Sequence, residues 1–469
     1  MNTSSPKTIC ALSTAPGMGA IALIRLSGKD AISILSQIAG KSFEQVASHS
    51  AHFVRLKHSD GSILDEVVVT IFHEGRSFTG ENTVEIACHG SVFIQQEIIR
   101  LLLANGCELA KPGEFTMRAF LNGRMDLSQA EAVSDLIASE SARSHEVAMN
   151  QMRGSFSNEL RDLREKLIHF ASLVELELDF AEEDVEFADR TELLALVVEV
   201  LEYVRRLIRS FELGNVLKNG VPVAIVGAPN TGKSTLLNQL LGEERAIVSN
   251  IAGTTRDVIE ETMNIDGILF RLIDTAGIRE EAAEEIEALG IQRSLDKIKQ
   301  ARIVLMLSDF SGDNASEEGH LSMSSEETGK WADEQAKIYP GKHFLVIGNK
   351  YDLRADQLNA PWEFQTPFLP ISAKNGSGIE ELKSWLSQQI LGSFNTQSDT
   401  IITNARHLDA LEKTRDALEK AQWGLETNIT GDFVAMDIRQ AMFWLGSITG
   451  QISEDDLLAN IFSKFCIGK

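Results

Sequence analysis

The sequence predicts a small α+β domain followed by an all-α domain, with an α/β phosphate-loop domain inserted into the helical one. The proline distribution indicates the helical parts, because no proline occurs between Pro112 and Pro222 or after Pro370, and helix interiors tolerate proline least. Between these stretches an apolar run opens into a glycine-rich turn, VPVAIVGAPNTGKST at residues 221–235. A strand that leads into such a turn is typical of a phosphate-binding loop. Helical stretches on both sides of an α/β segment therefore predict an insertion.

Each domain has its own local pattern. Residues 21–26, 67–72 and 84–87 are short apolar runs bounded by turn signals, as expected of strands in an α+β domain. Residues 125–213 contain a single glycine and repeat apolar residues at helical spacing. The polar stretch 311–330 is expected to be a loop. The predicted boundaries are 1–120 for the α+β domain, 121–216 plus 386–469 for the discontinuous helical domain, and 217–385 for the inserted domain.

Composition limits the classes of protein. At 469 residues the chain can form several cores, and its formal net charge of -24 argues against a general basic surface that coats nucleic acid. No apolar run approaches the ~18 residues that a membrane span needs, and the start MNTSSPKTIC lacks the basic and apolar parts of a signal peptide. The four cysteines form no C-x-x-C pair, which argues against a local zinc site or a disulfide framework. We therefore expect a cytoplasmic protein without a membrane anchor.

The glycine-rich turn has the chemistry of a phosphate site. Gly227, Gly232, Lys233 and Ser234 match the spacing G-x-x-x-x-G-K-[ST]. Glycines let backbone N–H groups close around phosphates, the lysine meets their terminal charge, and the serine hydroxyl can coordinate Mg²⁺. A nucleoside triphosphate is the ligand that this pattern predicts.

Two later segments supply candidate partners for the metal and the γ-phosphate. The segment 247–257 contains Thr255, whose hydroxyl can complete Mg²⁺ coordination. An apolar strand ends in D-T-A-G at 274–277, where Asp274 can hold the metal through water and the Gly277 N–H can sense the γ-phosphate.

Two further motifs predict which base is bound. N-K-Y-D at 349–352 and S-A-K at 372–374 each follow an apolar strand. The carboxylate of Asp352 can accept both the N1–H and the N2–H of guanine, which adenine cannot offer, and a backbone N–H near Ala373 can donate to O6. The sequence therefore predicts GTP over ATP. Any one of these motifs could be an ordinary loop, but four in the right order at strand ends argue strongly against chance.

These motifs make the inserted segment similar to a translation-factor-class GTPase domain. The chain as a whole resembles the bacterial tRNA-modifying GTPase family MnmE, also called TrmE, over essentially all of its 469 residues. The motifs outside the phosphate loop that carry this resemblance are Phe78-Thr79-Gly80-Glu81-Asn82, Pro112-Gly113-Glu114-Phe115, Arg118-Ala119-Phe120-Leu121-Asn122, Gly253-Thr254-Thr255-Arg256-Asp257 and Phe465-Cys466-Ile467-Gly468-Lys469.

Hydrolysis needs a group that orients water, and Ile278 stands where a regulatory GTPase has a glutamine. The resemblance implies that a glutamate a short way downstream acts on the attacking water. The match over 287–291 makes this residue Glu287, with Glu284 and Glu285 as rivals.

The resemblance also implies a bound K⁺ that neutralises charge in place of an arginine finger. Asn230 and oxygens at Ser249, Ile251 and Thr254 match the family's K⁺ ligands, although Asn230 could be merely a polar loop residue. Ser234 and Thr255 are the predicted Mg²⁺ ligands. Together, the motifs and the resemblance place the nucleotide and ion contacts at Asn230, Thr231, Gly232, Lys233, Ser234, Thr235, Ser249, Asn250, Ile251, Ala252, Gly253, Thr254, Thr255, Asp274, Thr275, Ala276, Gly277, Asn349, Lys350, Asp352, Ser372, Ala373 and Lys374.

The N-terminal domain of the family binds a formyl- or methylene-tetrahydrofolate, and the resemblance carries this expectation to residues 1–120. Arg25, Glu85 and Arg124 fall on the folate-contacting positions, and Lys469 is expected to reach in from the C-terminus. A carboxylate can pair with the amino and ring N–H groups of a pterin, and basic residues suit the glutamate tail. The alternative is ordinary surface ion pairing of Arg25 and Arg124.

The resemblance further implies partners and a reaction. The N-terminal domains are expected to form a homodimer, which joins the flavoprotein MnmG (GidA) in a heterotetramer or larger assembly. The pair installs an aminomethyl or carboxymethylaminomethyl group at C5 of the wobble uridine of certain tRNAs. Cys466 is a candidate nucleophile, with a buried structural thiol as the alternative. The competing function is a GTP-dependent switch or an RNA or ribosome assembly factor without folate chemistry.

Overall fold

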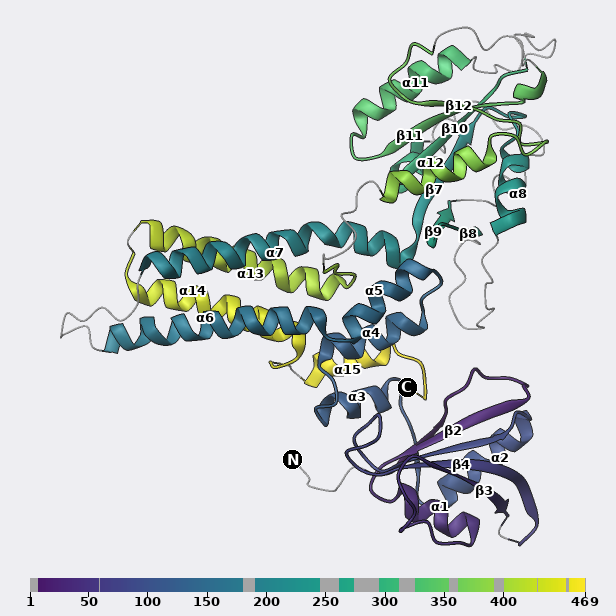
Figure 1. Cartoon of the computed structure of the whole chain (residues 1–469), viewed down its shortest axis with the longest axis vertical. Coiled ribbons are helices and arrows are strands. Elements are labelled where there is room, and N and C mark those ends of the chain that lie inside the picture. The colour runs from purple at the N-terminus through teal and green to yellow at the C-terminus, as the bar shows by residue number, and fades with distance from the viewer. Residues whose placement is uncertain are drawn as a thin grey trace. The chain divides into compact units, whose positions relative to one another are not determined.

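The computed structural model describes residues 7–58, 60–179, 190–244, 261–273, 295–311, 325–353, 362–391, 400–427, 429–452 and 455–468 (Figure 1). The chain divides into two compact units. One comprises Met1–Ile137, Ala148–Arg205 and Asp409–Lys469, and the other comprises Ala138–Val147 and Arg206–Leu408. Among the described helices, none has both the length and the apolar character that crossing a bilayer requires.

The N-terminal part is an α+β domain built on one sheet, as predicted. Its strands run in the order β3-β4-β5-β2-β1-β6. Neighbours are antiparallel except β1 and β6, which are parallel. The bounds are β1 Ile9–Leu12, β2 Ile21–Ser27, β3 Ser50–Lys57, β4 Ile63–Phe72, β5 Thr83–His89 and β6 Glu108–Leu109, with helices α1 Ala31–Ala39, α2 Val92–Ala104 and α3 Glu114–Leu121.

The two faces of this sheet are covered differently. Side chains alternate along a strand, and one set, including Ile24 of β2 and Ile86 of β5, packs with residues of α1 and α2 into the main core. On the opposite face Ala11 and Phe115 belong to a much smaller apolar cluster. Arg25 and Glu85, which are paired in the β2–β5 register, lie on this same face, and their polar groups make it a candidate place for a site.

The helical part confirms the prediction from proline and glycine spacing. Helix α14 packs against α6, and the Nε of Arg164 on α6 donates to the Met442 carbonyl on α14 at 3.3 Å. The apolar face of α14 is buried at Val434, Ile438 and Leu445. The bounds are α4 Leu127–Ile137, α5 Ala142–Met152, α6 Ser155–Asp179, α7 Arg190–Asn219, α13 Ala405–Glu426, α14 Gly431–Thr449 and α15 Asp455–Ser463.

The inserted domain is a mostly parallel α/β sheet in the order β12-β11-β10-β7-β9-β8. Among the described strands of this sheet, β8 alone pairs antiparallel to its neighbour, β9. Apolar clusters pack on both faces, one with residues of α8 and α12 and the other with residues of α11. The bounds are β7 Val221–Gly227, β8 Glu261–Ile265, β9 Ile268–Leu272, β10 Ile303–Asp309, β11 His343–Asn349, β12 Phe368–Pro370, α8 Lys233–Glu244, α11 Ser325–Ile338 and α12 Ile379–Leu391.

One local prediction for this domain is wrong in part. The polar stretch 311–330 was expected to be a loop, but α11 begins at Ser325. The helical pattern of SEETGKWADEQAKI is weak because most of its residues are polar and only the inner face is apolar, as at the fully buried Ala332. Glu326 and Glu327 in its first turn favour a helix start there.

Candidate functional site

The phosphate loop joins β7 to α8 and is shaped by backbone conformations that few residues adopt. Asn230 has φ 64° and Gly232 has φ 96°. A Cβ at Gly232 would lie 2.2 Å from Nδ2 of Asn349, so the close approach requires glycine as much as the dihedral does. Helix α8 begins directly afterwards, at Lys233. Its N-terminal N–H groups and helix dipole favour an anion at this position.

Lys233 lies inside the curled loop and is buried. Its Nζ donates to the carbonyl oxygens of Gly227 at 3.0 Å and Ala228 at 2.9 Å. Thr231 Oγ1 donates to the same Ala228 carbonyl at 2.8 Å. A positive charge held by neutral carbonyls can exchange them for phosphate oxygens, which are better partners. The residues present therefore fit a nucleoside phosphate.

Asn349 connects three of the predicted motifs. Its side-chain Nδ2 donates to the Thr231 carbonyl at 2.8 Å, and its Oδ1 accepts the Ala373 N–H at 3.0 Å. The side chain is only 3% exposed, so both bonds are shielded from water. The phosphate loop, 118 residues before Asn349, and the S-A-K loop, 24 residues after it, thus meet the N-K-Y-D element at one amide group.

The base-reading end of the site has an exposed carboxylate, that of Asp352, and a backbone donor, the Ala373 N–H, that already makes a hydrogen bond. Asp352 lies in a short 3-10 turn, Tyr351–Leu353, and is exposed. Among the described residues, none hydrogen-bonds to its carboxylate. The Ala373 N–H, expected near guanine O6, is bonded to Asn349 instead. Which N–H near Ala373 donates to O6 therefore stays a prediction, and the exposed Lys374 follows directly.

The structure describes two further residues of the predicted site, Ser372 and Ser234, whose roles stay predictions. Ser372 is buried, and its backbone N–H pairs with Ser377 at 2.9 Å, which closes the S-A-K loop. Ser234 and Thr235 lie in the first turn of α8. Among the described residues, no group of three or more His, Cys, Asp or Glu side chains gathers as a metal site.

The remaining nucleotide and ion residues lie outside the described residues, so their predicted roles stay predictions. They are Ser249, Asn250, Ile251, Ala252, Gly253, Thr254, Thr255, Asp274, Thr275, Ala276, Gly277, Glu284, Glu285 and Glu287.

In the N-terminal domain, two predicted folate residues pair with each other. Arg25 and Glu85 face each other in the β2–β5 register. Arg25 Nε and Nη2 donate to Glu85 Oε1 at 3.0 and 2.8 Å. The guanidinium also lies 5.9 Å from the Phe78 ring centre and 5.7 Å from that of Phe115. Arg25 is thus ion-paired in this structure, but its side chain is only 16% exposed and the pair is not an ordinary surface one. A planar ligand with N–H donors could replace Arg25 on Glu85.

Arg124 lies apart from this ion pair but contacts the loop that carries Phe78. It is exposed, and its Nη1 donates to the Gly75 carbonyl at 3.2 Å. The same loop meets Arg124 at Gly80, whose absent Cβ would lie 3.3 Å from Arg124 Cγ.

The C-terminal tail docks beside β1. The Gly113 N–H donates to the Cys466 carbonyl at 3.3 Å, and Ser13 Oγ donates to the Gly468 carbonyl at 3.1 Å. Gly468 has φ 92°, and a Cβ there would lie 2.2 Å from the Leu12 carbonyl oxygen. Lys469 itself lies outside the described residues. The described part of the tail thus reaches Leu12, the neighbour of Ala11, which pairs with Arg25 across β1 and β2.

The thiol of Cys466 is exposed, so the alternative of a buried structural thiol is wrong. The tail is anchored by the buried residues Phe465 and Gly468, and the two residues between them, Cys466 and Ile467, are exposed to solvent. Cys10, Cys88 and Cys107 are buried, as expected of structural cysteines.

Sequence reasoning missed a buried charge network that supports this end of the domain. Arg118 is 7% exposed and pairs with Glu81 at 3.1 Å and Glu114 at 2.8 Å. Ser27 Oγ donates to Glu81 Oε2 at 2.7 Å. The signal available was that each of the motifs at 78–82, 112–115 and 118–122 contains a charged residue, two negative and one positive.

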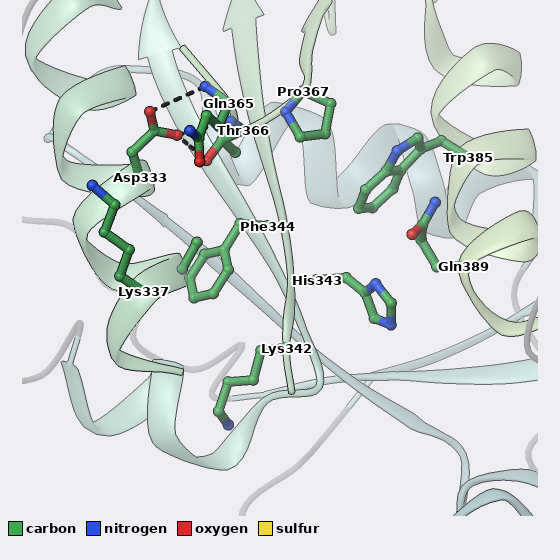
Figure 2. A pocket seen from close by; sticks show the side chains of 11 residues that line it. Asp333, Lys337, Lys342, His343, Phe344, Gln365, Thr366, Pro367, Trp385 and Gln389 are labelled. Carbon is green, nitrogen blue, oxygen red and sulfur yellow. Dashed lines mark hydrogen bonds between the residues drawn. The ribbon is translucent and has the colours of Figure 1, made fainter. Parts of the chain in front are cut away.

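The inserted domain also has a cavity of about 430 Å³, which lies away from the candidate nucleotide site (Figure 2). His343, Phe344, Trp385 and Gln389 contribute to its lining. His343 is the first residue of β11 whereas Asn349 is the last. The cavity is therefore at the opposite end of this strand from the candidate nucleotide site.

The parallel strands β7, β11 and β12 place a phosphate loop, an N-K-Y-D element and an S-A-K loop at one edge of the sheet, which defines the class as a P-loop GTPase. The family model described as MnmE helical domain matches residues 127–466, and the one described as GTP-binding protein TrmE N-terminus matches residues 8–124. The chain belongs to the MnmE family of tRNA modification GTPases.

Curated relatives match along the whole chain. The tRNA modification GTPase MnmE of Cytophaga hutchinsonii is 54% identical and covers 100% of this chain and 99% of its own. The protein of the same description from Flavobacterium psychrophilum is 50% identical, covering 98% of this chain and 99% of its own. That from Bacteroides thetaiotaomicron is 50% identical with the same coverage of 98% and 99%.

Proposed function

We propose that this chain is a K⁺-stimulated GTPase that works with a flavoprotein of the MnmG type on tRNA. The pair installs an aminomethyl or carboxymethylaminomethyl group at C5 of the wobble uridine, with a one-carbon unit from a tetrahydrofolate derivative. The observation that carries the GTPase part is the bonding of Asn349 to both the phosphate loop and the S-A-K loop. Family membership supports the tRNA part.

In this proposal the described residues bind and orient GTP. Lys233 and the first N–H groups of α8 hold the phosphates, and Asp352 accepts the two guanine N–H groups. Ser234, with Thr255, would hold Mg²⁺, which neutralises charge on the phosphates when bound. Because Ile278 cannot orient water, Glu287 takes that role, with Glu284 and Glu285 as rivals.

The K⁺ part rests on Asn230, with Ser249, Ile251 and Thr254. Asn230 is exposed at the tip of the phosphate loop, where its amide oxygen is available to a cation. Replacing KCl by NaCl should slow GTP hydrolysis strongly with little loss of GTP binding. Asn230→Gly should do the same in KCl, because glycine keeps the φ of 64° without the amide oxygen. Equal hydrolysis rates in both salts would refute the K⁺ role.

The folate part rests on Arg25, Glu85, Arg124 and Lys469, beside the docked tail. The Arg25–Glu85 ion pair is also the observation that favours the second candidate, a GTP-dependent switch or RNA assembly factor without folate chemistry. Titration of the full-length protein with 5-formyl-tetrahydrofolate separates the two. Saturable binding that Glu85→Gln weakens supports the proposal, and its absence beside normal GTP binding supports the switch.

The tRNA reaction is tested in cells. Nucleoside analysis of tRNA from cells lacking this protein should show wobble uridines without the C5 group, and unchanged uridines would refute the main function. Cys466, whose thiol is exposed, is proposed as the nucleophile. Normal tRNA modification in a Cys466→Ser variant would remove it from the mechanism.

The proposed assembly is a cytoplasmic homodimer through residues 1–120, joined by the flavoprotein and acting on tRNA. Large apolar side chains that the N-terminal domain leaves exposed support a protein partner there, including Met18 at 91% and Phe53 at 63% exposed. The proposed division is 1–120, 121–216 plus 386–469, and 217–385. Sedimentation of the chain alone should give a dimer, and a monomer at micromolar concentration would refute this contact.

A further inference from the structure

Asp309, the last residue of β10, is tied to the base-reading element. It lies opposite Asn349 in the β10–β11 register. Its Oδ2 accepts Nζ of Lys350 at 2.5 Å, while its Oδ1 accepts the N–H of Ser311 at 2.9 Å and its Oγ–H at 2.6 Å. The side chains of Lys350 and Asp309 are 34% and 28% exposed, so solvent screens this pair only in part.

Lys350 has a backbone conformation that must be held. Its φ is 63°, in the left-handed region that a lysine seldom adopts. Such a residue persists where the surrounding structure constrains it. Here the Leu353 N–H donates to its carbonyl at 3.1 Å, and the Phe310 N–H donates to the preceding carbonyl of Asn349 at 2.8 Å. The ion pair with Asp309 is the constraint on its side chain.

The Asp309 side chain is in the charged state that the ion pair with Lys350 requires. Partial burial alone would raise the pKa of its carboxyl, but the hydrogen bonds from Lys350 and Ser311 outweigh burial and lower the pKa below its ordinary value. Asp309 is therefore a carboxylate at neutral pH and keeps the Lys350 ammonium in place.

We propose that Asp309 is a positioning residue for guanine selectivity: by anchoring Lys350 it fixes the turn that presents Asp352 to the N1–H and N2–H of the base. The inference rests on the proposed GTP-binding function of the same site. Asp352 is two residues from Lys350 and exposed, so its direction depends on how that turn is held. If the turn is held less firmly, the contact of Asp352 with both guanine N–H groups weakens before the other nucleotide contacts, because it needs both hydrogen bonds aligned.

The test compares the binding of GDP and IDP, which differ in the N2 amino group, to the full-length protein by competition with a fluorescent GDP. Asp309→Asn keeps the shape and the acceptor for Ser311 but removes the charge that holds Lys350. We expect the Kd of GDP to rise about fivefold and that of IDP to rise less, so that the preference for GDP falls. A merely structural loss would weaken both nucleotides by the same factor.

The matched control is Asp333→Asn. Asp333 is another carboxylate of this domain whose hydrogen bonds lower its pKa against the effect of burial. Its partners are the Gln365 and Thr366 N–H groups and the Thr366 hydroxyl, beside the cavity of Figure 2. This variant should leave the GDP to IDP preference unchanged.

Lys350→Met provides a second variant should Asp309→Asn fail to fold, and it should lower the preference in the same way. The double variant should be no worse than the worse single variant, because both remove one interaction. An unchanged preference in both single variants, with GDP binding otherwise normal, overturns the inference alone. Absence of GDP binding in the unaltered protein would overturn the proposed function.

Discussion

The nucleotide site and the Arg25–Glu85 site are built in different ways. In the nucleotide site, backbone conformation comes first: Gly232 at φ 96° and Lys350 at φ 63° set the path of the chain, and Asn349 joins the loops through backbone groups. In the N-terminal site, charged side chains are arranged against one another, with Arg25 on Glu85 and Arg118 between Glu81 and Glu114.

The difference explains why the two sites are unequally visible in a sequence. A loop whose shape depends on glycine at a fixed offset leaves a short motif that can be read directly. An ion pair across two strands leaves no such trace, because Arg25 and Glu85 are brought together by sheet register. We therefore call the nucleotide site backbone-built and the Arg25–Glu85 site charge-built. A single substitution should abolish most binding at the backbone-built site, whereas at the charge-built site the loss should be in proportion to the charge removed.

The largest effect is expected from Gly232→Ala. The new Cβ would lie 2.2 Å from Asn349 Nδ2 and the residue would keep a φ of 96°, so the bond between Asn349 and the phosphate loop must break. We expect GTP affinity to fall by about tenfold or more, measured with a fluorescent analogue. Gly242→Ala is the control, because nothing lies within 4 Å of its Cβ. Normal GTP binding by Gly232→Ala would contradict the backbone account.

The next effect concerns the charge-built site. Arg25→Met leaves the Glu85 carboxylate without its partner, and the side chains are only 16% and 23% exposed. We expect a loss of about 1–2 kcal/mol in the free energy of unfolding. The double variant Arg25→Met, Glu85→Gln should lose less than the sum of the two single variants. Strict additivity in urea unfolding would show that the two side chains do not interact.

A smaller and local effect is expected from Gly468→Ala, which tests a backbone contact within the charge-built site. The Cβ would lie 2.2 Å from the Leu12 carbonyl oxygen, so the tail should leave β1 with little change in global stability. Carboxypeptidase should then release C-terminal residues several times faster. Ile467→Ala, at a position 62% exposed, serves as the control. Equal release rates would mean that the tail contact contributes nothing to docking.

The smallest effect is a pH dependence outside both sites. Burial, and then the nearby Arg302 charge, lower the pKa of His343 below its ordinary value. Below about pH 6.5 the unfolded chain binds a proton that folded His343 does not, so stability falls as pH decreases through this window. His343→Gln should flatten this part of the profile, followed by thermal unfolding, and leave GTP binding unchanged. A steeper profile in the variant would contradict the sign.

Much of the fold followed from local pattern. The runs at 21–26, 67–72 and 84–87 are strands because short apolar segments that are rich in β-branched residues and bounded by turn residues favour the strand conformation. Helix α11 was missed because its apolar positions are few and spaced within a polar sequence. The charge network of Arg118 was missed because burial of a charged residue is decided by partners that are distant in the chain.

The sequence by itself determined the phosphate loop, the preference for guanine and the helical setting, because glycine, proline and helical spacing act over a few residues. Tertiary structure alone decided that Asn349 joins two loops, that Arg25 faces Glu85, that Gly468 docks beside Leu12 and that Lys350 is held by Asp309. These contacts join residues that only strand pairing and packing bring within hydrogen-bond distance, and no local pattern encodes such a distance.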